Sequence, residues 1–105
     1  MGQFVVGNRS TPLHKIVRIL EYVNQREVVG ELELDDFMLQ KCEYDRYNFR
    51  IDIREKLREN GWLGYGNGEY YIRLSGRRCV QGLSRTLPEH ERPERYRSAR
   101  RPDAA

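Results

Sequence analysis

The 105-residue sequence predicts a small α+β domain in which three helices precede a β-hairpin and a short final helix. Apolar residues recur at helical spacing in three separate segments before Gly61. Two short runs of aromatic and aliphatic residues after Gly61 flank Asn67-Gly68, a dipeptide that strongly favours a tight hairpin turn. Gly61 follows the third helical segment directly, and a glycine ends a helix there because it adopts the left-handed conformation at little cost.

The first helix is predicted over residues 12–26. Ser10 and Thr11 supply a hydroxyl cap, and Pro12 suits the first helical turn because its missing amide would be unpaired there in any case. The apolar side chains that follow share one helical face: Leu13, Ile16, Val17, Leu20 and Val23. Residues 1–9 lack a helical period, so we expect an N-terminal arm in which residues 4–6 can form a short strand.

The next segments predict a short strand and two further helices. Residues 31–34 alternate polar and apolar side chains, which is typical of a short edge strand. Asp35 suits the N-cap of a second helix through about residue 41, and Asp45 suits the N-cap of the third, which ends at Asn60-Gly61. The side chains expected to face the core are Phe37, Met38 and Cys42 in the second helical segment, and Phe49, Ile53 and Leu57 in the third.

The hairpin strands are predicted at residues 62–65 and 69–74. Side chains alternate between the two faces of a strand. Tyr70, Ile72 and Leu74 therefore share one face, and Glu69, Tyr71 and Arg73 share the other. Ser75 is expected to cap a final helix through Leu83, with Val80 and Leu83 packing back on the core.

The composition changes from about residue 84. Residues 84–105 hold six Arg, four acidic residues and three Pro, with few apolar groups. Such a segment buries too little surface to offset the entropy lost on ordering, so we expect a disordered Arg/Pro-rich tail. The predicted organisation is an arm over 1–9, a domain over 10–83 and a tail over 84–105.

Composition limits the classes of function. The chain has 19 Lys and Arg against 16 Asp and Glu, a net charge of +3 that is compatible with nucleic-acid binding. It holds no apolar run of the roughly 20 residues that a membrane helix needs. The N-terminus lacks a secretory pattern, so we expect a cytoplasmic protein without membrane contact. Cys42 and Cys79 fit no metal motif, and neither His14 nor His90 pairs with a nucleophile, so we expect no enzyme active site, metal or cofactor.

Four pieces of the chain carry a family resemblance. They are the capped helix ending near Arg26, Leu34-Asp35-Asp36-Phe37, the stretch 49–63 and the stretch 70–78. Together, residues 11–83 resemble the winged helix-turn-helix superfamily of transcription factors, and the last piece is similar to MarR- and PadR-like regulators. The resemblance implies a three-helix core, a wing of two or three β-strands and a short C-terminal helix. It further implies sequence-specific binding of duplex DNA by a small transcriptional regulator.

The resemblance places the groove-entering residues in the first half of the third helix. Arg can contact guanine through two acceptors, Asn can pair with adenine, and Ile can meet the methyl group of thymine. With Phe49, Ile53 and Leu57 pointing inward, we expect Arg50 and Arg54 on an exposed flank. The candidate nucleic-acid contacts are Arg46, Tyr47, Asn48, Arg50, Ile51 and Arg54 on the third helix, with Asn67, Tyr71, Arg73, Arg77 and Arg78 on the wing and the final helix.

Two departures from the family pattern favour an alternative. The wing tip carries Asn67 but neither Lys nor Arg, and the region around the second helix is acidic. Winged helices also serve as protein–protein modules, so the alternative is an adaptor that binds another protein. A homodimer is compatible with DNA binding because pairing two half-sites raises affinity, although no coiled-coil segment specifies one.

Overall fold

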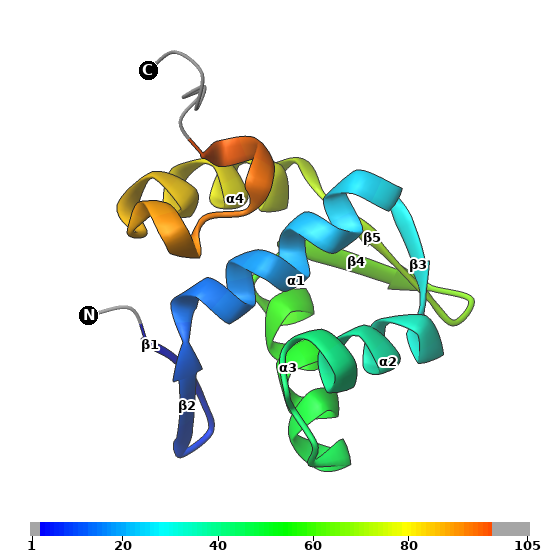
Figure 1. Cartoon of the computed structure of the whole chain (residues 1–105). Coiled ribbons are helices and arrows are strands. Elements are labelled where there is room, and N and C mark those ends of the chain that lie inside the picture. The colour runs from blue at the N-terminus through cyan, green and yellow to red at the C-terminus, as the bar shows by residue number, and fades with distance from the viewer. Residues whose placement is uncertain (1–2, 98–105) are drawn as a thin grey trace, which may run out of the picture.

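The computed structural model describes residues 3–97. Helix α1 (Leu13–Arg26) lies at the centre of the hydrophobic core. Figure 1 shows α1 crossing the centre of the molecule, with the last helix on one side and the second and third helices on the other. The other elements are β1 (Gln3–Val6), β2 (Arg9–Pro12), β3 (Val28–Gly30), α2 (Glu31–Lys41), α3 (Tyr47–Glu59), β4 (Leu63–Gly66), β5 (Glu69–Ile72), α4 (Leu74–Thr86) and two short 3₁₀ turns, Glu89–Glu91 and Glu94–Tyr96. The described residues thus form an α+β domain with four α-helices and two small antiparallel sheets.

The segment before α1 forms a hairpin. Residues 9–12 pair with β1 in an antiparallel ladder, so Ser10 and Thr11 lie in β2 and do not cap α1. Gly7, with φ of 64°, makes the turn between the strands. Phe4 and Val6 alternate into the core, and the Thr11 hydroxyl hydrogen-bonds to that of Tyr44. The predicted arm is therefore a packed hairpin that continues past residue 9.

The predicted strand over residues 31–34 is wrong, because α2 begins at Glu31 and the strand is β3, three residues earlier. The alternation in the sequence is misleading, since Leu34 is buried but Leu32 is exposed. A helix from residue 31 places Leu34 and Met38, four residues apart, in the core. Asp35 consequently lies inside the helix and does not cap it.

The predictions for α3 and the following hairpin are largely confirmed. Ile53 and Leu57 are fully buried, and Gly61 ends the helix with φ of 78°. Asn67 and Gly68 both have positive φ, 54° and 76°, as a two-residue type I′ turn requires. Two details differ. Arg46, not Asp45, is the N-cap of α3, and Leu74 opens α4 as an exposed residue instead of extending the sheet.

The chain after α4 folds back on α1. The expectation of disorder from residue 84 fails for residues 84–97, which contain the buried Ser84 and Leu87. The sequence pattern did not reveal the buried carboxylate of Glu21 on α1, whose Oε2 lies 2.7 Å from Arg95 Nε. This ion pair and the burial of Leu87 offset the entropy lost on ordering. Residues 98–105 of the predicted tail and residues 1–2 of the predicted arm lie outside the described residues.

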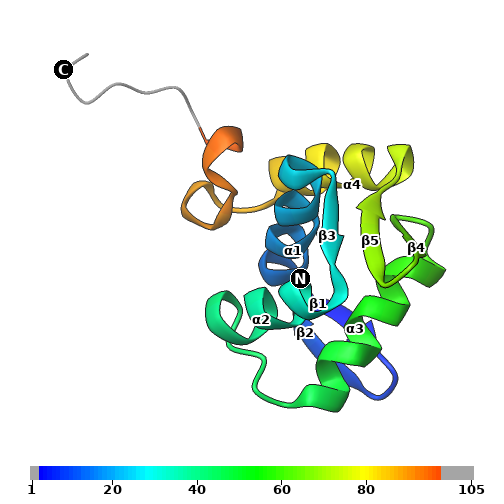
Figure 2. The same ribbon diagram turned by 90° about the vertical axis from the view of Figure 1, so that its right-hand side faces the viewer.

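The second sheet joins segments that are distant in the sequence. Its strand order is β3-β5-β4, with Val29 opposite Tyr70 and Leu63 opposite Ile72. Figure 2 shows this sheet beside α1, with the start of α4 next to the end of β5. The order of elements from α1 to α4 is compatible with a winged-helix-like fold. In the described part of the chain, no helix combines the length and apolar character that crossing a membrane requires.

Gly76 of α4 packs closely against the backbone of Trp62, which follows α3, so adding a single methyl group at Gly76 tests this contact. A Cβ at Gly76 would lie 2.2 Å from the carbonyl oxygen of Trp62, whereas one at Gly82 would meet no heavy atom within 4 Å. We expect Gly76→Ala to lower the free energy of unfolding by about 1–3 kcal/mol through overpacking. Gly82→Ala in the same helix should raise it by up to about 1 kcal/mol. Urea unfolding measures both, and equal effects of the two variants would contradict the packing described.

Candidate nucleic-acid interface

The structure divides the residues predicted on α3 into exposed and buried sets. Arg46, Tyr47 and Asn48 are exposed at the start of the helix, and Ile51 is half-buried. Arg50 and Arg54 are buried, with 8% and 3% of their surface exposed. The expectation that these two arginines flank an outward surface is wrong, because both side chains are packed inside the domain.

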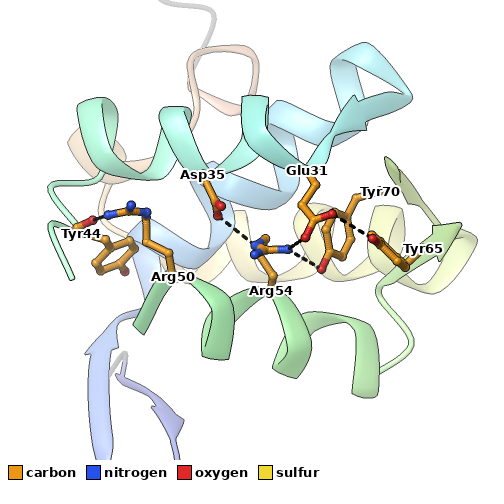
Figure 3. A network of polar contacts seen from close by, with 7 residues as sticks. All are labelled: Glu31, Asp35, Tyr44, Arg50, Arg54, Tyr65 and Tyr70. Carbon is orange, nitrogen blue, oxygen red and sulfur yellow. Dashed lines mark hydrogen bonds and ion pairs between the residues drawn. The ribbon is translucent and has the colours of Figure 1, made fainter. Parts of the chain in front are cut away.

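Arg54 lies at the centre of a polar network that joins α3 to α2 and β5 (Figure 3). Its Nη1 donates hydrogen bonds to Glu31 Oε2 at 3.1 Å and to the Tyr70 hydroxyl at 3.0 Å. Its Nε lies 2.9 Å from Asp35 Oδ1. This last contact is an ion pair without hydrogen-bond geometry, so no donor in residues 3–97 hydrogen-bonds either carboxylate oxygen of Asp35. The charge of Arg54 is therefore what compensates the buried Asp35.

The network extends through Glu31 to β4. The Tyr65 hydroxyl donates to Glu31 Oε1 at 2.8 Å. Hydrogen bonds from Tyr65 and Arg54 hold the pKa of the Glu31 carboxyl below its ordinary value. Burial alone would lower the pKa of Arg54, but its contacts with Tyr70, Asp35 and Glu31 outweigh that effect and raise it. Glu31 and Arg54 therefore stay charged at neutral pH, and the network fixes α2, α3, β4 and β5 together.

Arg50 holds the connection between α2 and α3. Its Nη1 donates to the backbone carbonyl of Tyr44 at 2.6 Å. The ring of Tyr44 meets Phe49 edge-on at 5.6 Å between centroids, and burial raises the pKa of the Tyr44 hydroxyl to about 12. Arg50 is thus a structural residue that satisfies a buried carbonyl.

A sequence signal for this burial was present. Glu31 and Asp35 are four residues apart on α2, and Arg50 and Arg54 are four residues apart on α3. Residues at this spacing share one face of a helix, so a pair of acids and a pair of arginines can meet across two packed helices. Burial could not be deduced from the spacing alone, because each pair also suits a solvated surface.

The outermost row of α3 is acidic. Four exposed residues lie opposite the buried row at spacings of four, three and four: Asn48, Asp52, Glu55 and Glu59. Arg9 of the β1–β2 hairpin reaches across to this row, with its Nη2 2.9 Å from Asp52 Oδ2. Three carboxylates on the outer row make insertion of the whole helix into a phosphate-lined groove electrostatically unfavourable.

The arginines predicted on α4 are exposed. Arg73 is the N-cap of α4, and Arg77 and Arg78 lie in its first turns. Arg85 is also exposed, and α4 contains no Asp or Glu. We call Arg73, Arg77, Arg78 and Arg85 the α4 arginines. None of them forms an ion pair within residues 3–97, whereas ion pairs there involve Arg9, Arg26, Arg54, Arg92 and Arg95.

The exposed candidate residues at the start of α3 lie far from the exposed arginines at the start of α4. The backbone amide of Arg73 donates to the carbonyl of Trp62 at 3.0 Å, so α4 begins beside the end of α3. The 13 residues of α3 span about 20 Å at 1.5 Å per residue. Arg46, Tyr47 and Asn48 are therefore about one helix length from the start of α4.

The β4–β5 hairpin contributes one polar and one aromatic candidate. Asn67 is exposed at the turn, and no Lys or Arg lies between β4 and β5. Tyr71 lies on the outer face of the sheet, opposite Gly64 of β4 and Val28 of β3. Its ring covers Gly64 so closely that a Cβ there would lie 2.1 Å from Tyr71 Cζ.

An open cavity of about 500 Å³ lies where the end of α3, the outer face of the sheet and the start of α4 meet. Its lining contains two arginines, two tyrosines and no acidic residue. The lining residues are Arg58, Gly61, Leu63, Gly64, Tyr65, Tyr71, Arg73 and Ser75. The cavity thus combines guanidinium groups with aromatic rings.

The cysteines are two free thiols, with Cys42 buried and Cys79 half-buried. Burial raises the pKa of each thiol to about 11, so both are protonated at neutral pH. Among residues 3–97, no group of three His, Cys, Asp or Glu side chains is arranged to hold a metal ion.

Comparisons of the chain with models of protein families, with curated proteins and with solved structures gave no match.

Removing the Arg54 side chain tests the buried network. We expect Arg54→Met to lower the free energy of unfolding by about 3–5 kcal/mol, because it leaves the Asp35 carboxylate buried and unpaired. Arg78→Met, at an exposed helical site, should change it by less than about 0.5 kcal/mol. Chemical denaturation provides both values.

The double variant Arg54→Met with Asp35→Leu distinguishes lost charge compensation from lost packing. It should be more stable than Arg54→Met alone, since no uncompensated carboxylate remains at the site of Asp35. If Arg54→Met were as mild as Arg78→Met, Arg54 would not be the centre of a buried network.

Proposed function

We propose that this chain is a winged helix protein that binds duplex DNA, with the α4 arginines as its main contacts to phosphate. The observation that carries the proposal is the exposure of four arginines without carboxylate partners, on and beside a helix that has no acidic residue. Neutralisation of phosphates by such groups releases counterions and provides most of the affinity of nonspecific DNA binding. The fold assignment is supported by the strand β3 between α1 and α2, which pairs with the second strand of the hairpin after α3.

Sequence-specific regulation additionally needs contacts to base edges, because phosphate contacts carry no sequence information directly. The side chains suited to that role at the start of α3 are the exposed Arg46 and Asn48 and the half-buried Ile51. The first turn of α3 contains no acidic residue, which favours the approach of this helix end to a polyanion. We therefore propose that only the start of α3, and not its acidic outer row, contacts the bases.

The α4 arginines are tested by a duplex titration at several salt concentrations. We expect Arg77→Ser with Arg78→Ser to weaken binding and to reduce the slope of log affinity against log salt by up to about 2, at roughly 0.9 per phosphate contact. The matched control is Arg18→Ser with Lys41→Ser, which removes the same charge from exposed sites on α1 and α2. Fluorescence anisotropy of a labelled duplex provides the affinities.

The control and a third variant distinguish contact through α4 from attraction by net charge and from contact through α3 alone. Equal weakening in the control would mean that net charge alone attracts the duplex, and the assignment to α4 would fail. Arg46→Ala with Asn48→Ala should reduce discrimination between sequences while largely preserving the salt slope contributed by α4. Loss of all duplex binding in that variant, with none lost in the α4 variant, would place the interface on α3 alone.

A second function, docking of a protein partner, is favoured by the seam between α2 and α3. Asp35 and Arg54 meet at this seam. Leu32 and Leu39 lie three residues before and four after Asp35, and Ile51 lies three residues before Arg54. These spacings place all three apolar side chains along the solvent side of the same seam.

The seam surface, which we define as Leu32, Leu39, Tyr47 and Ile51, is apolar with an acidic surround. Leu32 is 79% exposed and Tyr47 is 54% exposed, which is unusual for large apolar side chains and typical of contact sites when they cluster. The same two helices and their connection carry exposed acidic residues, of which Glu33 pairs with Arg26 and Glu43 with Lys15: Glu33, Asp36, Glu43, Asp45 and Glu55. A basic amphipathic segment of another protein fits this chemistry, whereas two copies of the acidic surround would repel each other.

A synthetic amphipathic peptide of leucine and lysine provides a defined probe for the seam surface. We expect it to shift amide resonances of α2 and α3, and we expect Leu32→Ser with Leu39→Ser to abolish those shifts. Val5→Ser, at an exposed apolar site on β1, is the control and should leave them unchanged. Shifts confined to other elements, or equal shifts in both variants, would exclude docking at the seam.

A further inference from the structure

The cavity at the start of α4 has a distinctive charge. Arg58 and Arg73 line it, its lining contains no carboxylate, and neither arginine forms an ion pair within residues 3–97. Elsewhere in residues 3–97 an arginine beside an acid is neutralised, as Arg9 is by Asp52. Two unpaired guanidinium groups at one cavity favour an anion with several oxygens, and phosphate matches their planar donor geometry.

Arg58 is positioned at the cavity by Tyr65, which also lines it. Its Cζ lies 5.1 Å from the centroid of the Tyr65 ring, a cation–π distance. Tyr65 is fixed in turn, because its hydroxyl donates to Glu31 and its ring packs against Tyr70 at 4.7 Å between centroids. The buried network around Arg54 includes Glu31 and Tyr70, as Figure 3 shows. It therefore positions Tyr65, which lines one side of the cavity.

The second wall provides an aromatic surface. Tyr71 is 40% exposed, and its ring lies over Gly64, where any larger residue would collide with it. The backbone of Gly64 does not have positive φ, so glycine is needed at this position for space and not for its conformation. A tyrosine held in this way offers ring surface on which a planar base can stack.

We propose that this cavity binds a nucleotide, with Arg58 and Arg73 on the phosphate and the base on Tyr71. Its volume of about 500 Å³ exceeds what a phosphate ion alone needs and lies within the roughly 300–1,000 Å³ typical of ligand sites. The inference deepens the proposed DNA function, on which it rests for the source of the ligand: an unpaired nucleotide at the end of a DNA strand. A free nucleotide has the same chemistry, so the test separates the two sources.

The test compares three probes by amide chemical shifts of Gly61 and Gly64: inorganic phosphate, adenosine monophosphate and a short 5′-phosphorylated single strand. We expect adenosine monophosphate to bind roughly tenfold more tightly than phosphate, because stacking adds to the phosphate contact. Tighter binding of the single strand than of adenosine monophosphate supports a strand end as the ligand, and the reverse order supports a free nucleotide.

Two variants separate the phosphate and base contacts. Arg58→Gln with Arg73→Gln should abolish the binding of all three probes, whereas Lys41→Gln, at an exposed site on α2, should not. Gly64→Ala should displace the Tyr71 ring and weaken adenosine monophosphate about tenfold while sparing inorganic phosphate. Tyr71→Leu provides a second test of the ring if Gly64→Ala does not fold.

Three results would overturn the proposal. They are the absence of shifts at Gly61 and Gly64, equal affinity for adenosine monophosphate and phosphate, and no effect of either ring variant on the preference between them. Failure of the DNA function is distinguishable, because it is measured on intact duplex with Arg77 and Arg78, which do not line the cavity.

Discussion

The buried guanidinium of Arg54 is the interaction on which the rest of this structure depends. With only 3% of its surface exposed, it contacts Glu31 and Asp35 of α2 and Tyr70 of β5. A charge in this position would be costly if unpaired, so the two carboxylates and the hydroxyl must be present for α3 to pack. The network thereby fixes how α2, α3 and the sheet are placed around α1.

The same network determines where the molecule can meet its partners. It withdraws Arg54 from the surface, while Arg50 is withdrawn by the carbonyl of Tyr44, so α3 retains an outer row that is mostly acidic. The α4 arginines remain exposed and form no ion pair within residues 3–97. Through Glu31 and Tyr65 the network also supports the cavity beside Arg58. We therefore propose two separate binding surfaces: α4 contacts phosphate, and the seam surface of α2 and α3 binds an apolar segment of a protein partner.

Local patterns in the sequence were sufficient where local physics decides the structure. The stripe of Ile53 and Leu57, the helix end at Gly61 and the turn at Asn67-Gly68 depend on spacing and on backbone conformation, and all were predicted. The α+β fold class was also predicted correctly. Of the candidate contacts, the exposure of those on α4 and at the start of α3 agrees with the sequence-based expectation.

The failures all involve contacts between distant segments. The hairpin before α1 depends on β1 pairing with residues 9–12, and the order of residues 84–97 depends on Glu21 and Arg95, 74 positions apart. Burial of Arg54 depends on acids 19 and 23 residues earlier, and their alternation with leucines suggested a strand in place of α2. Helical periodicity identifies which residues share a face, but it does not tell a solvated charged face from one paired with opposite charges.

The most direct test of the account is side-chain NMR of the arginine Nε–H groups, recorded before and after addition of duplex DNA. The account expects a slowly exchanging Arg54 resonance that keeps its position, while resonances of the α4 arginines shift. A rapidly exchanging Arg54 signal that moves with the duplex would show that this arginine is an exposed DNA contact, and the arrangement argued for above would be contradicted.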